Sequence, residues 1–267
     1  MTKNNVPVIV NSTVCYLIAF LTTTILHESA HAFSGMLYDS QPVLHHNYVE
    51  HFANDNLSVY DLVAIALAGP LLSLTQAIVI ASIYINYKRQ NLFRLFLLWF
   101  SVLGFNNFFG YLMTGPIFKN GDIGKAYLLL ESSLWLQILL ALLGIVCLTF
   151  LAYKLTIPFL RFSYLTEWIV NAKARKRFAF QILILPWLIG SSVITLLFLP
   201  IIAIISIIYP VMSGMIFIFP WQNAEKPEQF NLSINRTIGK ISIPAIIILL
   251  CLMGVFKFVL APGIQLF

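Results

Sequence analysis

Long apolar segments are the feature that most limits the folds open to this chain. Segments with almost no charge recur along the sequence, and each reaches or exceeds the roughly 20 residues that a helix needs to cross a bilayer. We expect spans at about residues 8–38, 59–87, 92–118, 126–153 and 241–260, while 178–220 could hold two spans or one span plus a re-entrant piece. Because the bilayer core contains no water to hydrogen-bond the backbone, the N–H and C=O groups of such segments must bond to one another, and we expect the segments to be helical. The sequence therefore predicts an all-α polytopic integral membrane protein with six or seven transmembrane helices.

The amino-acid composition agrees with a membrane location. Hydrophobic residues make up 60% of the chain and charged residues only 10%, whereas soluble proteins carry roughly 25% charged residues. The net charge of +6 is concentrated near the ends of the apolar segments. This pattern favours a lipid bilayer, and not nucleic acid, as the partner of the positive charge.

The basic residues also indicate an orientation. If seven spans begin with the N-terminus inside, ten Lys and Arg residues lie on the inner side over the first four helices and two on the outer side. The inner group is Lys3, Lys88, Arg89, Arg94, Lys154, Arg161, Lys173, Arg175, Lys176 and Arg177, and the outer group is Lys119 and Lys125. The positive-inside rule then places the N-terminus in the cytoplasm.

The first apolar segment contains the motif H-E-x-x-H, formed by His27, Glu28 and His31. On a helix the two histidines lie one turn apart on the same face, where both can bind one zinc ion. The intervening glutamate then stands beside the metal as a general base that activates water. Ionisable groups within a spanning helix are costly and face the bundle interior or a watery cavity. Metal binding is the favoured interpretation, and a polar cluster that ties helices together is the alternative.

Two zinc ligands require at least a third, and several side chains are candidates. Asp122 lies in a glycine-flanked turn after a proline-broken span, from which a carboxylate can turn back toward the bundle. Glu131 is the main competitor, and Glu167 is a further one. The polar loop at 39–58 also holds three histidines that could act as extra ligands or as a gate. These are His45, His46 and His51.

Asn106 and Asn107 make the third apolar segment unusually polar. Their amides could hold an unwound substrate strand through hydrogen bonds. Interhelical hydrogen bonding is the alternative role for these side chains.

These features resemble the site-2 protease family of intramembrane zinc metalloproteases. The resemblance rests on the H-E-x-x-H motif in a membrane helix, Ala-Gly-Pro at 68–70 in the next helix, and Asp122 closing the third. It covers about residues 10–130 and identifies the chain as a short, divergent member. The resemblance implies a three-helix catalytic core within residues 1–130, in which Asp122 supplies the third zinc ligand.

The remainder of the chain, residues 131–267, carries no recognised motif. We expect it to add transmembrane helices and a basic interfacial segment near 154–177.

The expected function is zinc-dependent hydrolysis of a peptide bond in or near a membrane-spanning segment of a protein or peptide precursor, at the cell membrane. The alternative is a non-catalytic metal-binding membrane protein, such as a carrier, a chaperone-like factor or an immunity factor. The sequence names neither the substrate nor the oligomeric state.

Overall fold

Six long helices dominate the fold. The structure is a computed structural model that describes residues 5–53, 57–199, 205–226 and 236–266. Within these residues, six helices are long and apolar enough to cross a membrane: α1 (Val6–Leu37), α2 (Val59–Asn86), α3 (Leu92–Thr114), α5 (Leu134–Leu160), the continuous run Ala172–Leu197 and the run Ile243–Leu260. The predicted fold class is confirmed: the chain is an all-α polytopic membrane protein.

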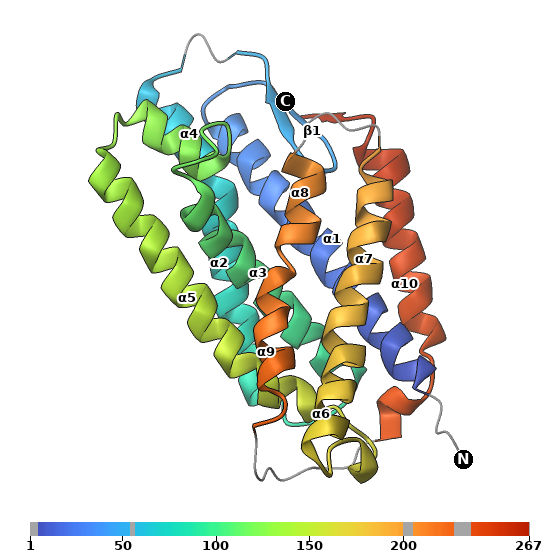
Figure 1. Cartoon of the computed structure of the whole chain (residues 1–267). Coiled ribbons are helices and arrows are strands. Elements are labelled where there is room, and N and C mark those ends of the chain that lie inside the picture. Colours follow the sequence, from blue (N-terminus) through green and yellow to red (C-terminus); the bar gives the residue numbers. More distant parts are fainter. Residues whose placement is uncertain (1–4, 54–56, 200–204, 227–235, 267) are drawn as a thin grey trace. The chain divides into compact units, whose positions relative to one another are not determined.

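Two of these runs contain a wide helical turn. One π-helical turn, η3 (Phe180–Ile184), joins α6 (Ala172–Ala179) to α7 (Leu185–Leu197). Figure 1 shows α6 and α7 as one continuous helix. The last consists of α10 (Ile243–Gly254) and the π-helical turn η6 (Val255–Leu260).

The outward faces of the helices are strongly apolar. Only 11% of the spanning part of α5 is buried, and its exposed side chains include Leu139, Val146 and Phe150. The spanning part of α10 is only 17% buried. Apolar surfaces of this extent are unfavourable in water but match the hydrocarbon core of a bilayer.

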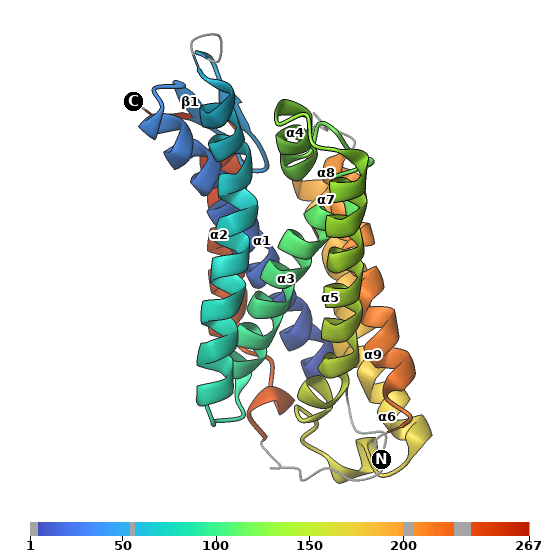
Figure 2. The same ribbon diagram turned by 90° about the vertical axis from the view of Figure 1, so that its left-hand side faces the viewer.

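Shorter elements connect the long helices. They are β1 (Pro42–Leu44), β2 (Val49–His51), α4 (Asp122–Leu129), η2 (Thr166–Trp168), α8 (Ile205–Met212), η4 (Met215–Phe217), α9 (Ile218–Asn223), η5 (Arg236–Gly239) and β3 (Ile264–Gln265). The turn between α2 and α3 is short (Figure 2).

The chain divides into two compact units, and several long helices contribute to both. The first unit contains residues 1–20, 80–101 and 149–251, and the second contains 21–79, 102–148 and 252–267. The division expected from the sequence, a catalytic core at 1–130 followed by additional helices at 131–267, concerns function and stays a prediction.

The first unit is built around the fully buried Trp99 of α3. The Trp99 indole N–H donates a hydrogen bond to the Ser12 hydroxyl at 3.0 Å, and that hydroxyl donates to the Ile182 carbonyl at 2.7 Å. Ile182 lies in the π-helical turn, and such turns leave carbonyls without their usual helical partners. The rings of Phe159 and Phe217 pack edge-on against Trp99. One polar chain and an aromatic cluster therefore fix the position of α1 in this unit.

The second unit holds the rest of α1 beside parts of α2 and α3. Its helices approach closely where small residues occur: an added Cβ at Gly104 would lie 2.9 Å from the Ser73 carbonyl oxygen. The Gln76 side-chain amide donates to the Thr23 hydroxyl at 3.0 Å, which joins α2 to α1. Small residues and side-chain hydrogen bonds are the usual means of helix association in lipid.

A small sheet also belongs to the second unit, although the sequence predicts only a loop at 39–58. The strand order is β2-β1-β3, and β1 pairs antiparallel with both neighbours. The C-terminal segment therefore returns to β1 (Figure 1).

The helix expected at 126–153 is in fact two helices. Glu131 has a φ of 48° and ends α4, after which α5 begins at Leu134. The Ser132 N–H donates to the Tyr127 carbonyl across this turn, a pattern that closes helices. In the region 154–177, α5 extends to Leu160 and α6 continues into α7. The interfacial location expected for this basic segment stays a prediction.

The expected segment 178–220 contains most of one of the six long apolar helices, which begins earlier, at Ala172, and ends at Leu197. The shorter helices α8 and α9 follow it. The predicted junction at Pro200 lies outside the described residues.

Candidate metal centre

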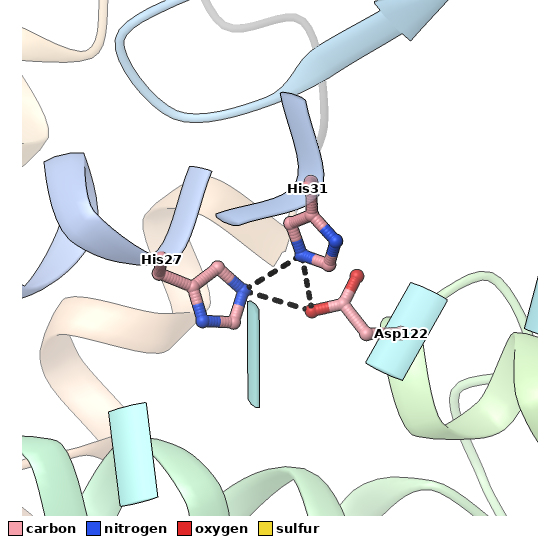
Figure 3. Close-up of side chains that lie close together, drawn as sticks. All are labelled: His27, His31 and Asp122. Atoms are coloured by element: carbon pink, nitrogen blue, oxygen red, sulfur yellow. Dashed lines mark hydrogen bonds and ion pairs between the residues drawn. The ribbon is translucent and has the colours of Figure 1, made fainter. Parts of the chain in front are cut away.

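The histidines of the H-E-x-x-H motif lie in the last third of α1, inside the second unit. His27 and His31 are 3% and 6% exposed, and their Nε2 atoms are 3.1 Å apart. Asp122 faces both rings, as Figure 3 shows. Its Oδ2 lies 2.9 Å from His27 Nε2 and 3.4 Å from His31 Nε2. We call these three residues the metal group.

The turn after α3 directs Asp122 toward the histidines. Asp122 is the first residue of α4, with Gly121 as its N-cap. An added Cβ at Gly124 would overlap the Phe118 carbonyl, so the turn can close tightly only around glycine. Burial alone would raise the pKa of Asp122, but the positive charge of His31 and hydrogen bonds from both imidazoles, when these rings carry an added proton, hold it well below its usual range. The carboxylate is therefore charged where it meets the rings.

Partners on α2 fix which nitrogen of each imidazole faces Asp122. His31 Nδ1 donates to the Ile65 carbonyl at 2.7 Å. His27 Nδ1 lies 3.1 Å from Ser73 Oγ, whose own proton goes to the Gly69 carbonyl at 3.1 Å, so the hydroxyl accepts from His27. Both rings are thereby protonated on Nδ1, and both Nε2 lone pairs point into the metal group.

The Gly-Pro sequence of α2 brings that helix against the imidazoles. An added Cβ at Gly69 would overlap His31 Nε2 and lie 2.8 Å from His27 Nε2. Pro70, inside the same helix, lacks the N–H of an ordinary helical residue and loosens this turn. Ile65, Gly69 and Ser73 recur every four residues, so one face of α2 provides both hydrogen-bond acceptors and the space between them.

The metal group has the donor set and spacing of a cation site. Two imidazole lone pairs and one carboxylate oxygen face a common point. Among the described residues, these three side chains form the group whose ligand atoms lie close enough together to hold a metal ion. Ligand atoms about 2.0–2.1 Å from a tetrahedral zinc lie about 3.3 Å from one another, close to the three distances between these atoms. Without a cation or an added proton, the three acceptors would repel one another. The residues therefore fit a metal such as zinc.

Glu28 accompanies the metal group but does not belong to it. Its side chain is 9% exposed and lies within electrostatic reach of His27, His31 and Asp122. A carboxylate in this position is available for proton transfer near the metal group.

The helix α3 provides one wall of the site. The ring of Tyr111 is stacked on the imidazole of His27, with 5.4 Å between centroids and 9° between planes. Asn106 and Asn107 lie on the same helix, one to two turns earlier, and both are 5% exposed. Their predicted role in substrate binding stays a prediction.

The other candidate ligands lie elsewhere in the described structure. Glu131 is exposed in the turn that ends α4. His51 Nδ1 lies 2.7 Å from Ser40 Oγ, and His45 faces Glu50 at 3.8 Å between Nε2 and Oε2.

Two of the loop histidines, His46 and His51, are suited to a neutral state at ordinary pH. Burial lowers the pKa of His51 to about 4, with the charges of His31 and Lys125 adding to the effect. Burial and the nearby charge of Lys257 lower the pKa of His46 to about 4 as well.

Three contributors to the site are absent from the expectations based on sequence. The Ile65 carbonyl is a backbone group and has no residue signature. Ser73 lies four residues after Gly69, and this spacing is the one signal that could have identified it. Tyr111 is one of 11 Tyr residues in a chain that also has 22 Phe residues, so the sequence gives no reason to single it out.

No protein-family model, curated protein or solved structure matches this chain. Interpretation of the site therefore depends on its own geometry.

The structure separates the two acids that compete as third ligand. We expect Asp122→Ala to lower zinc affinity at least tenfold, because it removes one donor of the metal group. Glu131→Ala should keep the wild-type zinc content, because Glu131 is exposed outside the group. Zinc content after purification and competition with a chelator measure both variants. Equal loss in the two variants, or loss only in Glu131→Ala, would refute Asp122 as a ligand.

Proposed function

We propose that this chain is an intramembrane zinc metalloprotease of the cell membrane. It hydrolyses a peptide bond in or near a membrane-spanning segment of a protein or peptide precursor. The observation that carries the proposal is the convergence of two Nε2 lone pairs and a carboxylate oxygen beside the buried Glu28. The resemblance of the motifs to site-2 proteases agrees with it.

His27, His31 and Asp122 would hold the zinc ion. When bound, zinc lowers the pKa of water and polarises a peptide carbonyl. The hydrogen bonds from His27 to Ser73 and from His31 to Ile65 keep both rings oriented for that task. The stacked Tyr111 ring limits rotation of His27.

Glu28 performs the proton transfers in this proposal. As a carboxylate it accepts a proton from the attacking water, and the resulting acid then delivers that proton to the leaving amine. Its burial keeps the carboxylate beside the metal group and out of bulk water.

The substrate must expose its scissile bond before attack. Peptide groups in a spanning helix are shielded by their own hydrogen bonds, so the segment has to unwind locally. The amides of Asn106 and Asn107 are suited to hold the unwound strand, because each offers donors and an acceptor.

Cleavage in cells tests the proposal against non-catalytic metal binding. We expect wild-type protein, co-expressed with a panel of tagged single-span membrane proteins, to shorten at least one of them. His27→Ala should leave all of them intact, because it loses a metal ligand. Glu131→Ala is the matched control and should cleave normally. If zinc is bound but no panel member or peptide precursor is ever cut, the protein is a metal carrier or an inactive relative.

A further inference from the structure

A second unusual side chain lies in the first unit, outside the metal centre. Arg94, near the start of α3, is only 8% exposed. One Nη1 hydrogen bond goes to the Lys88 carbonyl at 3.3 Å, and the guanidinium lies 4.8 Å from the centroid of the Tyr84 ring, with whose phenol it also shares a side-chain hydrogen bond. Its Nε is buried without a hydrogen-bond partner among the described residues. The positive charge is therefore only partly compensated by the protein.

The surrounding segments contain no acid that could balance this charge. The sequence has no Asp or Glu between Asp61 and Asp122, which covers the facing parts of α2 and α3. It has none between Glu131 and Glu167, which covers α5. Arg94 takes part in none of the ion pairs formed by the described residues. Burying a guanidinium without an acidic partner is unfavourable on general grounds.

Neighbouring cations increase this imbalance. Arg161, just after α5, and Arg94 both act electrostatically on the Tyr84 phenol, so two positive charges lie within electrostatic reach of one side chain. Lys88 and Arg89 are exposed in the turn between α2 and α3. The ends of these spans are the level at which lipid headgroups meet a membrane protein.

We propose that Arg94, Arg161 and Lys88 form a binding site for the phosphate of an anionic phospholipid headgroup. A phosphate offers acceptors to the guanidinium N–H groups that the Lys88 carbonyl does not use, in the fork geometry that suits arginine. Basic pockets between transmembrane helices bind such headgroups. Lipid is favoured over soluble phosphate because the site lies at the ends of three apolar spans, where headgroups are always present. This inference is independent of the metal centre and of the proposed protease activity.

Thermal unfolding in nanodiscs tests the site. In wild-type protein, adding phosphatidylglycerol to phosphatidylcholine nanodiscs should raise Tm by about 3 °C or more. Arg94→Met keeps much of the side-chain volume without the charge, and we expect it to lose this rise. In phosphatidylcholine alone the variant should unfold at or above the wild-type Tm, because it buries no unpaired charge. Lys154→Met is the matched control, since Lys154 is exposed and lies over the Phe150 ring of its own helix.

Three results would overturn the proposal. If Arg94→Met lowers Tm equally in both lipids and keeps the response to phosphatidylglycerol, Arg94 is a structural residue only. If inorganic phosphate in phosphatidylcholine nanodiscs gives the same rise, the ligand is a soluble phosphate. A second variant, Arg161→Gln, tests the site even if the Arg94 variant fails to fold, because Arg161 is exposed. It should retain phosphatidylglycerol about tenfold less well in native mass spectrometry, and unchanged retention would exclude Arg161 from the site.

Discussion

Glu28→Gln is expected to abolish peptide cleavage while leaving zinc in place. The amide keeps the size and the hydrogen-bonding shape of the carboxylate but accepts no proton from water. General-base catalysis contributes about a hundred- to ten-thousandfold, so we expect the cleavage rate to fall by roughly a thousandfold or more. Zinc content should stay at the wild-type level, because Glu28 is not a member of the metal group. The cleavage rate of an identified substrate and the zinc content of the same preparation are the two measurements.

The matched control for this variant is Glu131→Gln, which makes the same chemical change at an exposed turn. It should change neither rate nor zinc content. Retained cleavage in Glu28→Gln would remove Glu28 as the base. Loss of zinc together with cleavage would instead assign Glu28 a role in binding the metal.

The long helices could be predicted because lipid imposes one simple requirement on each of them. A continuous apolar run must be helical to satisfy its backbone, so hydropathy alone places α2 within one residue of its observed end. The break between α4 and α5 has no such signal. It depends on the backbone of Glu131, whose positive φ ends the helix within a run that remains apolar on both sides.

The sheet could not be predicted for a different reason. Its strands are three, three and two residues long, and β3 is separated from β1 by more than 200 residues. Pairing over that distance is set by how the helices bring β1 and β3 together. Strands this short show no alternation of polar and apolar residues from which the pairing could be predicted.

The site was predictable to the extent that its chemistry follows from helical spacing. Two histidines four residues apart on a helix must share a face, whatever surrounds them. Asp122 was one of several candidate acids, because its separation of 91 positions from His31 in the sequence says nothing about their distance in space. The orientation of the rings depends on Ser73 and on the Ile65 carbonyl, which are ordinary groups until the fold places them beside the histidines.

The packing of α2 on the metal group leads to the second large expected effect, which concerns Gly69→Ala. The new methyl group would overlap His31 Nε2 and lie 2.8 Å from His27 Nε2, closer than real Cβ contacts allow. Either the imidazoles must turn or α2 must retreat, and retreat would weaken the hydrogen bonds to Ile65 and Ser73. Disturbed outer partners typically cost ten- to a hundredfold in metal affinity, so we expect zinc affinity to fall by at least about tenfold.

Gly110→Ala provides the matched control for this effect. Gly110 also lies in a membrane helix of the second unit, but an added Cβ there meets no atom within 4 Å. Alanine is favoured over glycine in a helix by about 1 kcal/mol, so this variant should fold at least as well as wild type and bind zinc equally. Chelator competition on both variants, after each elutes as a single species in detergent, separates displacement of the ligands from general damage to the helices. Wild-type zinc affinity in Gly69→Ala would mean that close approach of α2 does not hold the imidazoles in place.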